Sequence, residues 1–305
     1  MTTLATIDVG TNTTLLLVAR AEPSGAIRVL DERAEITRLG RGIGVGGALG
    51  ADAIARTLDV LRAYAAIARS HGARVVAIGT EALRRAPNGA DFLGPAAAIL
   101  GAPVEVIDGA REAALTFRAT TSSFHEAARA GTLVVVDIGG GSTEIVVSQR
   151  GAVTFQTSLP LGSVRLTERH VRHDPPAPDE LAALAREVDD QLGAVPWPPS
   201  ATLVGVAGTV TSLAAMALGL ASYDPARVHG YELGLDALDG EIARLRTSTQ
   251  AARERIVGLD PRRADVILAG AVLLRRIAHA AGVSTIRVSD RGIRWGLLHE
   301  QLERA

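Results

Sequence analysis

The chain has 305 residues, a length that predicts about two domains, and its 47% hydrophobic and 21% charged composition favours full cores over disorder. Its net charge is −1 and aromatic residues make up only 3%, so neither nucleic acid nor an anionic membrane is an expected partner. Cysteine and lysine are absent from the sequence, which excludes disulfides, thiol nucleophiles, Cys-ligated zinc, P-loop or kinase lysines and Schiff bases.

Apolar β-rich runs alternate with helical patterns along the chain, which predicts an α/β fold. In the first half we expect strands at 5–9, 14–19 and 28–30, a helix at 51–70, a strand at 75–78, a helix at 91–100, a strand at 104–107 and a helix at 110–119. In the second half we expect strands at 133–138, 143–147 and 202–206, a helix after Gly208, a helix at 261–281, a strand at 285–288 and a helix at 291–304. A loop with three prolines at 174–179 begins a further helix.

The beginning of the chain carries no pattern of a secretion leader. The apolar run at residues 15–18 is far shorter than the roughly 20 residues of a membrane helix. We therefore expect a cytoplasmic protein.

One segment near the N-terminus recurs in the middle of the chain. Thr6–Thr11 resembles Val135–Gly140, and the aspartates at their centres are 137 − 8 = 129 residues apart. That interval is about one domain, far longer than the 20–50 residues of a solenoid repeat. The repeat therefore predicts a duplicated protein with two lobes and a phosphate site between them.

Each copy of the repeat reads as a strand, an Asp-x-Gly sequence, a turn of small residues and a second strand. Glycine lets the backbone approach a ligand, and successive N–H groups in such a turn form a nest for anions. We expect phosphate contacts from both turns, at Gly10, Thr11, Asn12, Thr13, Gly139, Gly140, Gly141, Ser142 and Thr143. The strand-end aspartates Asp8 and Asp137 can hold Mg²⁺. The alternative for each copy is an ordinary hairpin, in which Asp and Gly serve only as turn residues.

These motifs resemble those of the exopolyphosphatase/guanosine pentaphosphate phosphatase family. Ile7–Thr13 is similar to the family's N-terminal phosphate hairpin, and Asp137–Glu144 resembles its most diagnostic motif. The resemblance continues in order along the chain, through Arg38-Leu39-Gly40, Leu159-Pro160-Leu161-Gly162, Val206-Ala207-Gly208-Thr209 and Ser289-Asp290-Arg291-Gly292. It implies a duplicated actin-like (ribonuclease H-like) α/β fold of two domains with a cleft between the lobes. The expected domains are 1–122 and 123–290, with a C-terminal helix at 291–305 that packs back on the first.

The same resemblance suggests the catalytic residues. Ile107–Ala113 is similar to the family segment Ile-Ser-Gly-x-Glu-Glu-Ala, whose second Glu, the proposed general base, corresponds to Glu112. The first Glu of that segment is Arg111 here, and its effect stays open. Without the resemblance, Glu112 would be interpreted as a charge placed favourably at the start of a helix.

Two further segments are expected to bind phosphate. Gly79–Arg84 resembles a Thr-x-x-x-Arg stretch in which Arg84 directs its guanidinium at phosphate, although a solvated arginine at a helix end is the alternative. Gly208 and Thr209 open a helix after a strand, where N–H groups and the positive end of the helix dipole favour an anion. A helix cap with close packing would also explain them.

Together these features predict a phosphohydrolase that releases terminal orthophosphate from polyphosphate, guanosine pentaphosphate or both. In this hypothesis Glu112 activates water, while Asp137 and Glu144, with Asp8 as a further candidate, bind Mg²⁺. The resemblance also implies a homodimer and a role in the stringent response, and leaves open whether Mn²⁺ or K⁺ is used. Two alternatives remain: an ATP-dependent kinase of a small molecule, and a non-catalytic sensor of guanosine polyphosphates.

Overall fold

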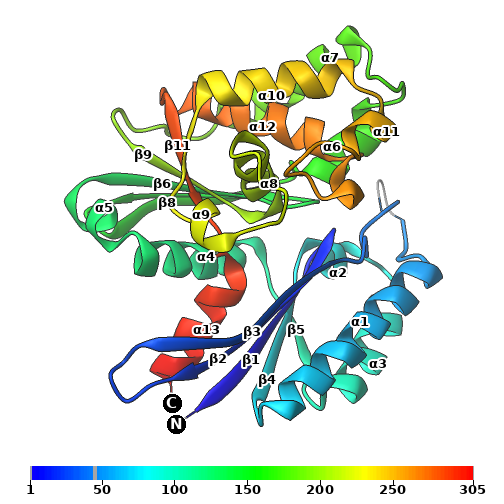
Figure 1. Ribbon diagram of the computed structural model, residues 1–305, viewed down its shortest axis with the longest axis vertical. Coiled ribbons are helices and arrows are strands. Elements are labelled where there is room, and N and C mark those ends of the chain that lie inside the picture. The colour runs from blue at the N-terminus through cyan, green and yellow to red at the C-terminus, as the bar shows by residue number, and fades with distance from the viewer. Residues whose placement is uncertain (1, 44–46, 305) are drawn as a thin grey trace. The chain divides into compact units, whose positions relative to one another are not determined.

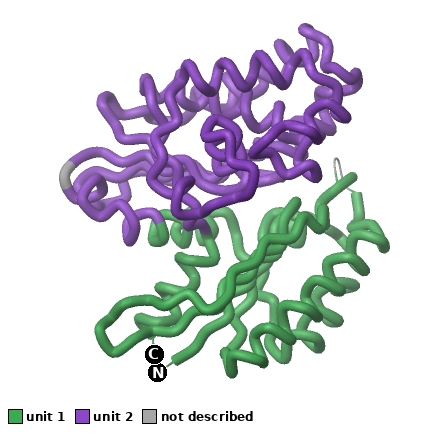
Figure 2. Tube along the Cα trace, viewed as in Figure 1, with its two compact units in different colours: residues 1–119, 293–305 green, residues 120–292 purple. Residues whose placement is uncertain are grey.

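The computed structural model describes residues 2–43 and 47–304. The chain forms two compact units, shown in different colours in Figure 2. Unit 1 comprises residues 1–119 and 293–305, and unit 2 comprises residues 120–292. The chain passes from unit 1 to unit 2 inside one helix, between Ala119 and Thr120, and returns after Gly292.

Unit 1 is a five-stranded sheet with helices on both faces (Figure 1). Its strands are β1 (Thr3–Val9), β2 (Thr13–Ala21), β3 (Ile27–Ile36), β4 (Arg74–Gly79) and β5 (Val104–Val106). Its helices are α1 (Ala51–Ser70), α2 (Glu81–Arg85), α3 (Ala90–Leu100), α4 (Gly109–Ser123, which continues into unit 2) and α13 (Ile293–Glu303).

The alternation of residues along β1 assigns the two faces of this sheet. Ala5, Ile7 and Val9 pack in the core beneath α1 and α3. Because successive side chains of a strand point to opposite faces, Leu4 and Asp8 belong to the other face. Leu4 packs there against Trp295 of α13, so Asp8 lies on the face that α13 covers.

Unit 2 is a six-stranded sheet whose main core lies on one face. Its strands are β6 (Thr132–Ile138), β7 (Thr143–Gln149), β8 (Ala152–Leu159), β9 (Thr202–Val206), β10 (Glu232–Gly234) and β11 (Thr285–Ser289). Its helices are α5 (His125–Ala130), α6 (Ser163–His170), α7 (Pro178–Leu192), α8 (Ala207–Ala217), α9 (Pro225–Val228), α10 (Leu235–Thr247), α11 (Gln250–Arg253) and α12 (Ile267–Ala280), with a 3-10 turn at Pro261–Arg263.

The two sheets share one plan, which confirms the duplication expected from the repeat. The strand order is β3-β2-β1-β4-β5 in unit 1 and β8-β7-β6-β9-β11 in unit 2, where β10 adds an edge. In both, the first two strands are antiparallel and the first and fourth are parallel. Asp8 and Asp137 hold corresponding places near the ends of β1 and β6.

Several predicted elements differ from those in the structure. The expected strand at 28–30 is part of the ten-residue β3, where charged residues interrupt the apolar pattern. The helix expected at 261–281 is a 3-10 turn followed by α12, because Asp260 caps a short turn at Pro261. The last helix begins at Ile293 rather than Arg291, and Ala305, included in its expected range, lies outside the described residues. The sequence did not predict β8, β10, α5, α6, α9, α10 and α11.

The described residues include no helix that is both long and apolar enough to cross a lipid bilayer.

Candidate active site

The first turn directs its carbonyl groups back into unit 1. Gly10 N–H closes the turn on Thr13 O at 3.1 Å. Gly40 and Arg38, in the segment after β3, donate their N–H groups to Thr11 O and Asn12 O at 2.8 and 2.9 Å. In the described part of the chain, the N–H groups of Thr11 and Asn12 donate to no backbone carbonyl.

The close approach of Gly40 and the conformation of Arg38 hold this turn in place. A Cβ at Gly40 would overlap the Thr11 side chain, so only glycine fits there. Arg38 has φ of +52°, a left-handed conformation that is uncommon for a residue with a side chain. The Asn12 amide is buried, and its Nδ2 has no hydrogen-bond partner among the described residues. An unsatisfied buried donor favours a ligand that accepts its hydrogen bond.

The second turn, in unit 2, repeats this arrangement with different residues. Gly139 N–H closes it on Ser142 O at 3.0 Å. The first N–H groups of α6 then take its carbonyls, because Ser163 donates to Gly139 O at 3.0 Å and Val164 to Gly140 O at 2.9 Å.

This bonding leaves the N–H groups of the second turn for a ligand. The side chain of Arg165 takes the last carbonyl, that of Gly141, at 2.7 Å. Within residues 2–43 and 47–304, the N–H groups of Gly140, Gly141 and Ser142 donate to no backbone carbonyl. Thr143 is fully buried and its hydroxyl donates to Leu161 O, so this side chain anchors the turn and is not available to a ligand.

Two carboxylates face each other across β6 and β7. Asp137 and Glu144 are directly paired in the strand register and are 8% and 2% exposed. Side chains of directly paired residues lie on the same face of a sheet. Ser158 of β8 donates to Glu144 Oε1 at 2.6 Å, which orients that carboxylate.

Unit 1 lacks the equivalent pair. The residue opposite Asp8 in β2 is Leu15, which carries no carboxylate. The described residues contain no group of three or more histidine and acidic side chains that could hold a metal ion.

The expected base and arginine come together in unit 1. Glu112 lies in the first turn of α4 and is 9% exposed. Arg84, at the end of α2, donates through Nη1 to Ile107 O at 2.6 Å and lies 3.5 Å from Glu112 Oε2. Because Ile107 precedes α4, this arginine connects the end of α2 with the start of α4.

The start of α8 has an arginine that the sequence did not predict as a site residue. A Cβ at Gly208 would overlap the guanidinium of Arg263, which therefore packs directly on that glycine. Burial lowers the pKa of Arg263, while Asp260, Tyr223 and Asp265 favour its charged form. Arg263 lies far from Gly208 in the sequence, so no sequence pattern indicated that they are in contact. Only the fold shows that Arg263 and the first turn of α8 are adjacent.

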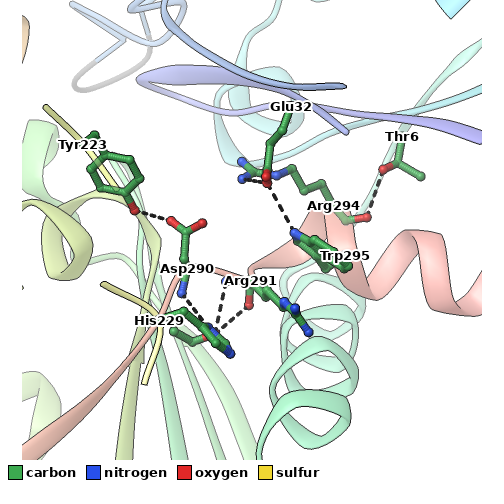
Figure 3. Close-up of polar contacts among 9 residues, drawn as sticks. Thr6, Glu32, Tyr223, His229, Asp290, Arg291, Arg294 and Trp295 are labelled. Carbon is green, nitrogen blue, oxygen red and sulfur yellow. Dashed lines mark hydrogen bonds and ion pairs between the residues drawn. The ribbon is translucent and has the colours of Figure 1, made fainter. Parts of the chain in front are cut away.

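The segment after β11 is held in unit 2 by polar contacts (Figure 3). The hydroxyl of Tyr223 donates to the carboxylate of Asp290. The backbone N–H of Asp290 in turn donates to His229 Nδ1 at 3.3 Å. Burial lowers the pKa of His229, and the charge of Arg291 lowers it further. A neutral imidazole with Nδ1 as acceptor fits this geometry, so these residues support the backbone.

The Ppx/GppA phosphatase family matches residues 17–305. The chain belongs to this family. Exopolyphosphatase 2 of Mycobacterium tuberculosis is 37% identical over 315 residues, which cover 97% of this chain and 98% of that protein. The expected family resemblance is thereby confirmed.

Solved structures of the Ppx/GppA family share the whole fold. The Aquifex aeolicus member has a TM-score of 0.84 at 32% identity, with 99% of this chain and 98% of that one covered. An exopolyphosphatase from Cytophaga hutchinsonii has a TM-score of 0.90 at 28% identity, with the same coverage. The duplicated actin-like α/β fold is confirmed.

Proposed function

We propose that this chain releases the terminal orthophosphate from inorganic polyphosphate. One observation carries the proposal: in each unit a tight turn has its carbonyl oxygens bonded inward, which leaves N–H groups for an anion. A polyphosphate offers many phosphoryl oxygens to such nests. Membership of a phosphatase family and the similarity to a protein named exopolyphosphatase support the substrate class.

Glu112 is the proposed general base. Its carboxylate can orient a water molecule and accept the proton as water attacks the terminal phosphorus. Arg84 lies beside it and can offer a guanidinium to phosphate oxygens, since only Nη1 is used on Ile107 O and Glu112. Phosphoryl transfer depends mainly on positioning and charge stabilisation, which these groups supply.

The start of α8 is a further proposed phosphate contact. Gly208 and Thr209 lie in its first turn, where the helix dipole is positive, and Arg263 adds a guanidinium at the same place. The partly buried surroundings of Arg263 strengthen its attraction for an anion.

The residues of unit 2 fit a divalent cation of the magnesium type. The charges of Asp137 and Glu144 repel each other in a buried setting, so a bound cation would stabilise the pair. Magnesium commonly takes one or two carboxylates and completes its shell with water and phosphate oxygens, which suits a pair without a third acidic ligand. Bound there, Mg²⁺ would neutralise charge on the substrate.

Other expectations stay predictions. They are the role of Asp8 in metal binding, the use of Mn²⁺ or K⁺, the homodimer, the cytoplasmic location, the stringent-response role and a substrate site between the two lobes. Guanosine pentaphosphate stays an alternative substrate that the assay below distinguishes.

The test measures phosphate release with Mg²⁺ from long-chain polyphosphate, guanosine pentaphosphate and ATP in parallel. We expect release from polyphosphate with ATP unchanged. Glu112→Gln should lower turnover by about 10²- to 10⁴-fold and retain polyphosphate binding, while Glu105→Gln, an exposed acid on β5, is the matched control. Near-normal turnover of Glu112→Gln would exclude its role as base. If phosphate is released from none of the three substrates, the non-catalytic sensor is favoured. ADP production from ATP that depends on a second substrate would instead favour the kinase.

A further inference from the structure

The first turn of α4 is capped by one side chain and leaves another free to reach a second helix. Asp108 Oδ1 accepts the N–H of Arg111 at 2.8 Å, and Asp108 O accepts the N–H of Glu112 at 3.0 Å. In a capping box the third helical position carries Glu or Gln, whose side chain bonds back to the cap residue. Arg111 occupies that position and has no acceptor atoms for this role.

The side chain of Arg111 instead joins α4 to α13. Its Nη2 forms a hydrogen-bonded ion pair with Glu300 Oε2. Glu300 is 7% exposed, and Arg304 donates to its other oxygen at 2.7 Å. The hydrogen bond to Glu300 raises the pKa of Arg111, and the bond from Arg111 lowers the pKa of Glu300, so both stay charged near neutral pH.

Close backbone contact beside the ion pair makes α13 a firm support. A Cβ at Gly296 would overlap the carbonyl oxygen of Leu115, so the backbones of α13 and α4 touch at this point. Leu115 also packs in one apolar cluster with Ile293 and Leu297 of α13. The ion pair therefore lies between this packed contact and the N-terminal end of α4, where Glu112 resides.

We propose that Arg111 is a positioning residue, which holds the first turn of α4 against α13 through Glu300 and so fixes the Glu112 carboxylate. This inference rests on the proposed role of Glu112 as base. A partly exposed ion pair adds little to stability, but a small displacement of a reacting group can lower a rate greatly. The main effect of the pair is therefore on turnover.

The matched control is a second ion pair between the same helices. Arg118 binds Glu303 farther along α4, and this pair is more exposed than the first. Arg118 lies two turns from Glu112, so loss of its charge removes an α4–α13 contact without releasing the first turn. A general weakening of the helix contact would affect both pairs. Positioning of the first turn depends on the hydrogen bond between Arg111 and Glu300, on which Arg118 acts only through its more distant charge.

The experiment is a double-mutant cycle on polyphosphate hydrolysis. The variants are Arg111→Gln, Glu300→Gln, their combination, Arg111→Lys as the conservative change, and Arg118→Gln as the control. We expect Arg111→Gln to lower kcat by about tenfold with KM within about twofold, as for a residue that acts on the transition state. The double variant should be no slower than the slower single variant, because both act through one contact. Arg111→Lys should restore most of the turnover.

Each other result overturns the inference. Equal losses in Arg111→Gln and Arg118→Gln would indicate a merely structural contact, and so would additive losses in the cycle. A rise in KM at constant kcat would show that Arg111 binds substrate. Glu112→Gln, measured alongside, separates the two hypotheses. If Glu112→Gln keeps full turnover, Glu112 is not the base. If Glu112→Gln loses turnover while Arg111→Gln keeps it, only the positioning role of Arg111 is excluded.

Discussion

Gly162 is a sharp test of how the second turn is built. It precedes α6, and a Cβ placed on it would overlap the carbonyl group of Gly140 and lie 2.6 Å from Gly141 N. The φ of Gly162 is −157°, which alanine adopts without strain, so Gly162→Ala changes packing alone. The turn cannot easily move away, because Val164 and Arg165 bond to the same Gly140 carbonyl at 2.9 and 3.1 Å.

The expected loss follows from overlap and from weakened hydrogen bonds. Overpacking of a close contact costs about 1–3 kcal/mol. Each backbone hydrogen bond stretched by the shift contributes about 0.5–1.5 kcal/mol. We therefore expect Gly162→Ala to lower the free energy of unfolding of unit 2 by about 2–4 kcal/mol. It should also slow phosphate release, since the displaced turn carries the N–H groups proposed to bind phosphate.

Urea unfolding followed by Trp197 fluorescence measures this loss in unit 2. Trp295 belongs to unit 1, so a common Trp295→Phe background leaves one probe. The control is Gly240→Ala in α10, where, among the described residues, the added Cβ meets no atom within 4 Å apart from its own helical backbone and chain neighbours. It should stabilise unit 2 by about 0.5–1 kcal/mol. Unchanged stability and full activity in Gly162→Ala would refute the account of the turn.

Three further predictions concern unit 2. Ser158→Ala removes the donor to Glu144 and should raise the Mg²⁺ concentration for half-maximal activity by about tenfold or more, measured by metal titration. Burial opposes ionisation of Glu180, but bonds from His173 and from backbone N–H groups lower its pKa from 4.5 to about 2. Its contribution to stability is thus present above pH 4.5 and lost as the pH falls toward 2, and the unfolding free energy of Glu180→Gln should depend less on pH in that window. Arg253→Met removes the guanidinium donor to the buried carbonyl oxygen of Ala264 and one of the donors to Leu245 O, which keeps the N–H of Ser248. It should lower the unfolding free energy by about 1–3 kcal/mol in urea titrations, whereas an unchanged value would contradict this role.

The fold could be predicted from the repeat, because the tight turn after each first strand requires glycine and small residues, and these recur in the sequence. Asp-x-Gly after an apolar strand recurs where each sheet makes the same turn, so Asp8 and Asp137 marked the two first strands correctly. The edge strand β8 was missed because one face is solvated and its residues alternate weakly. The break before α12 depends on the Asp260 cap, a local bond that an apolar run does not reveal.

The site was predictable only where chemistry and local sequence coincide. The glycine turns combine both, whereas Arg263 reaches Gly208 across more than fifty residues of sequence. No local pattern encodes such a contact, because it depends on how the turn before α12 packs on α8. Likewise, the sequence showed that Arg111 replaces a glutamate of the family segment but did not explain why. Only the structure shows that its partner is Glu300 of α13.

The duplicated sheets also show how one backbone plan supports different chemistry. The strand register pairs Asp8 with Leu15 in unit 1 and Asp137 with Glu144 in unit 2. Because Leu15 carries no carboxylate, β1 and β2 do not form a pair like Asp137 and Glu144, and the proposed two-carboxylate cation site lies in unit 2. In unit 1 the proposed catalytic carboxylate comes from a helix instead: it is Glu112 of α4, which lies beside Arg84. The turns are alike because every phosphate nest needs N–H groups, and the acids differ because binding a cation and activating water require different surroundings.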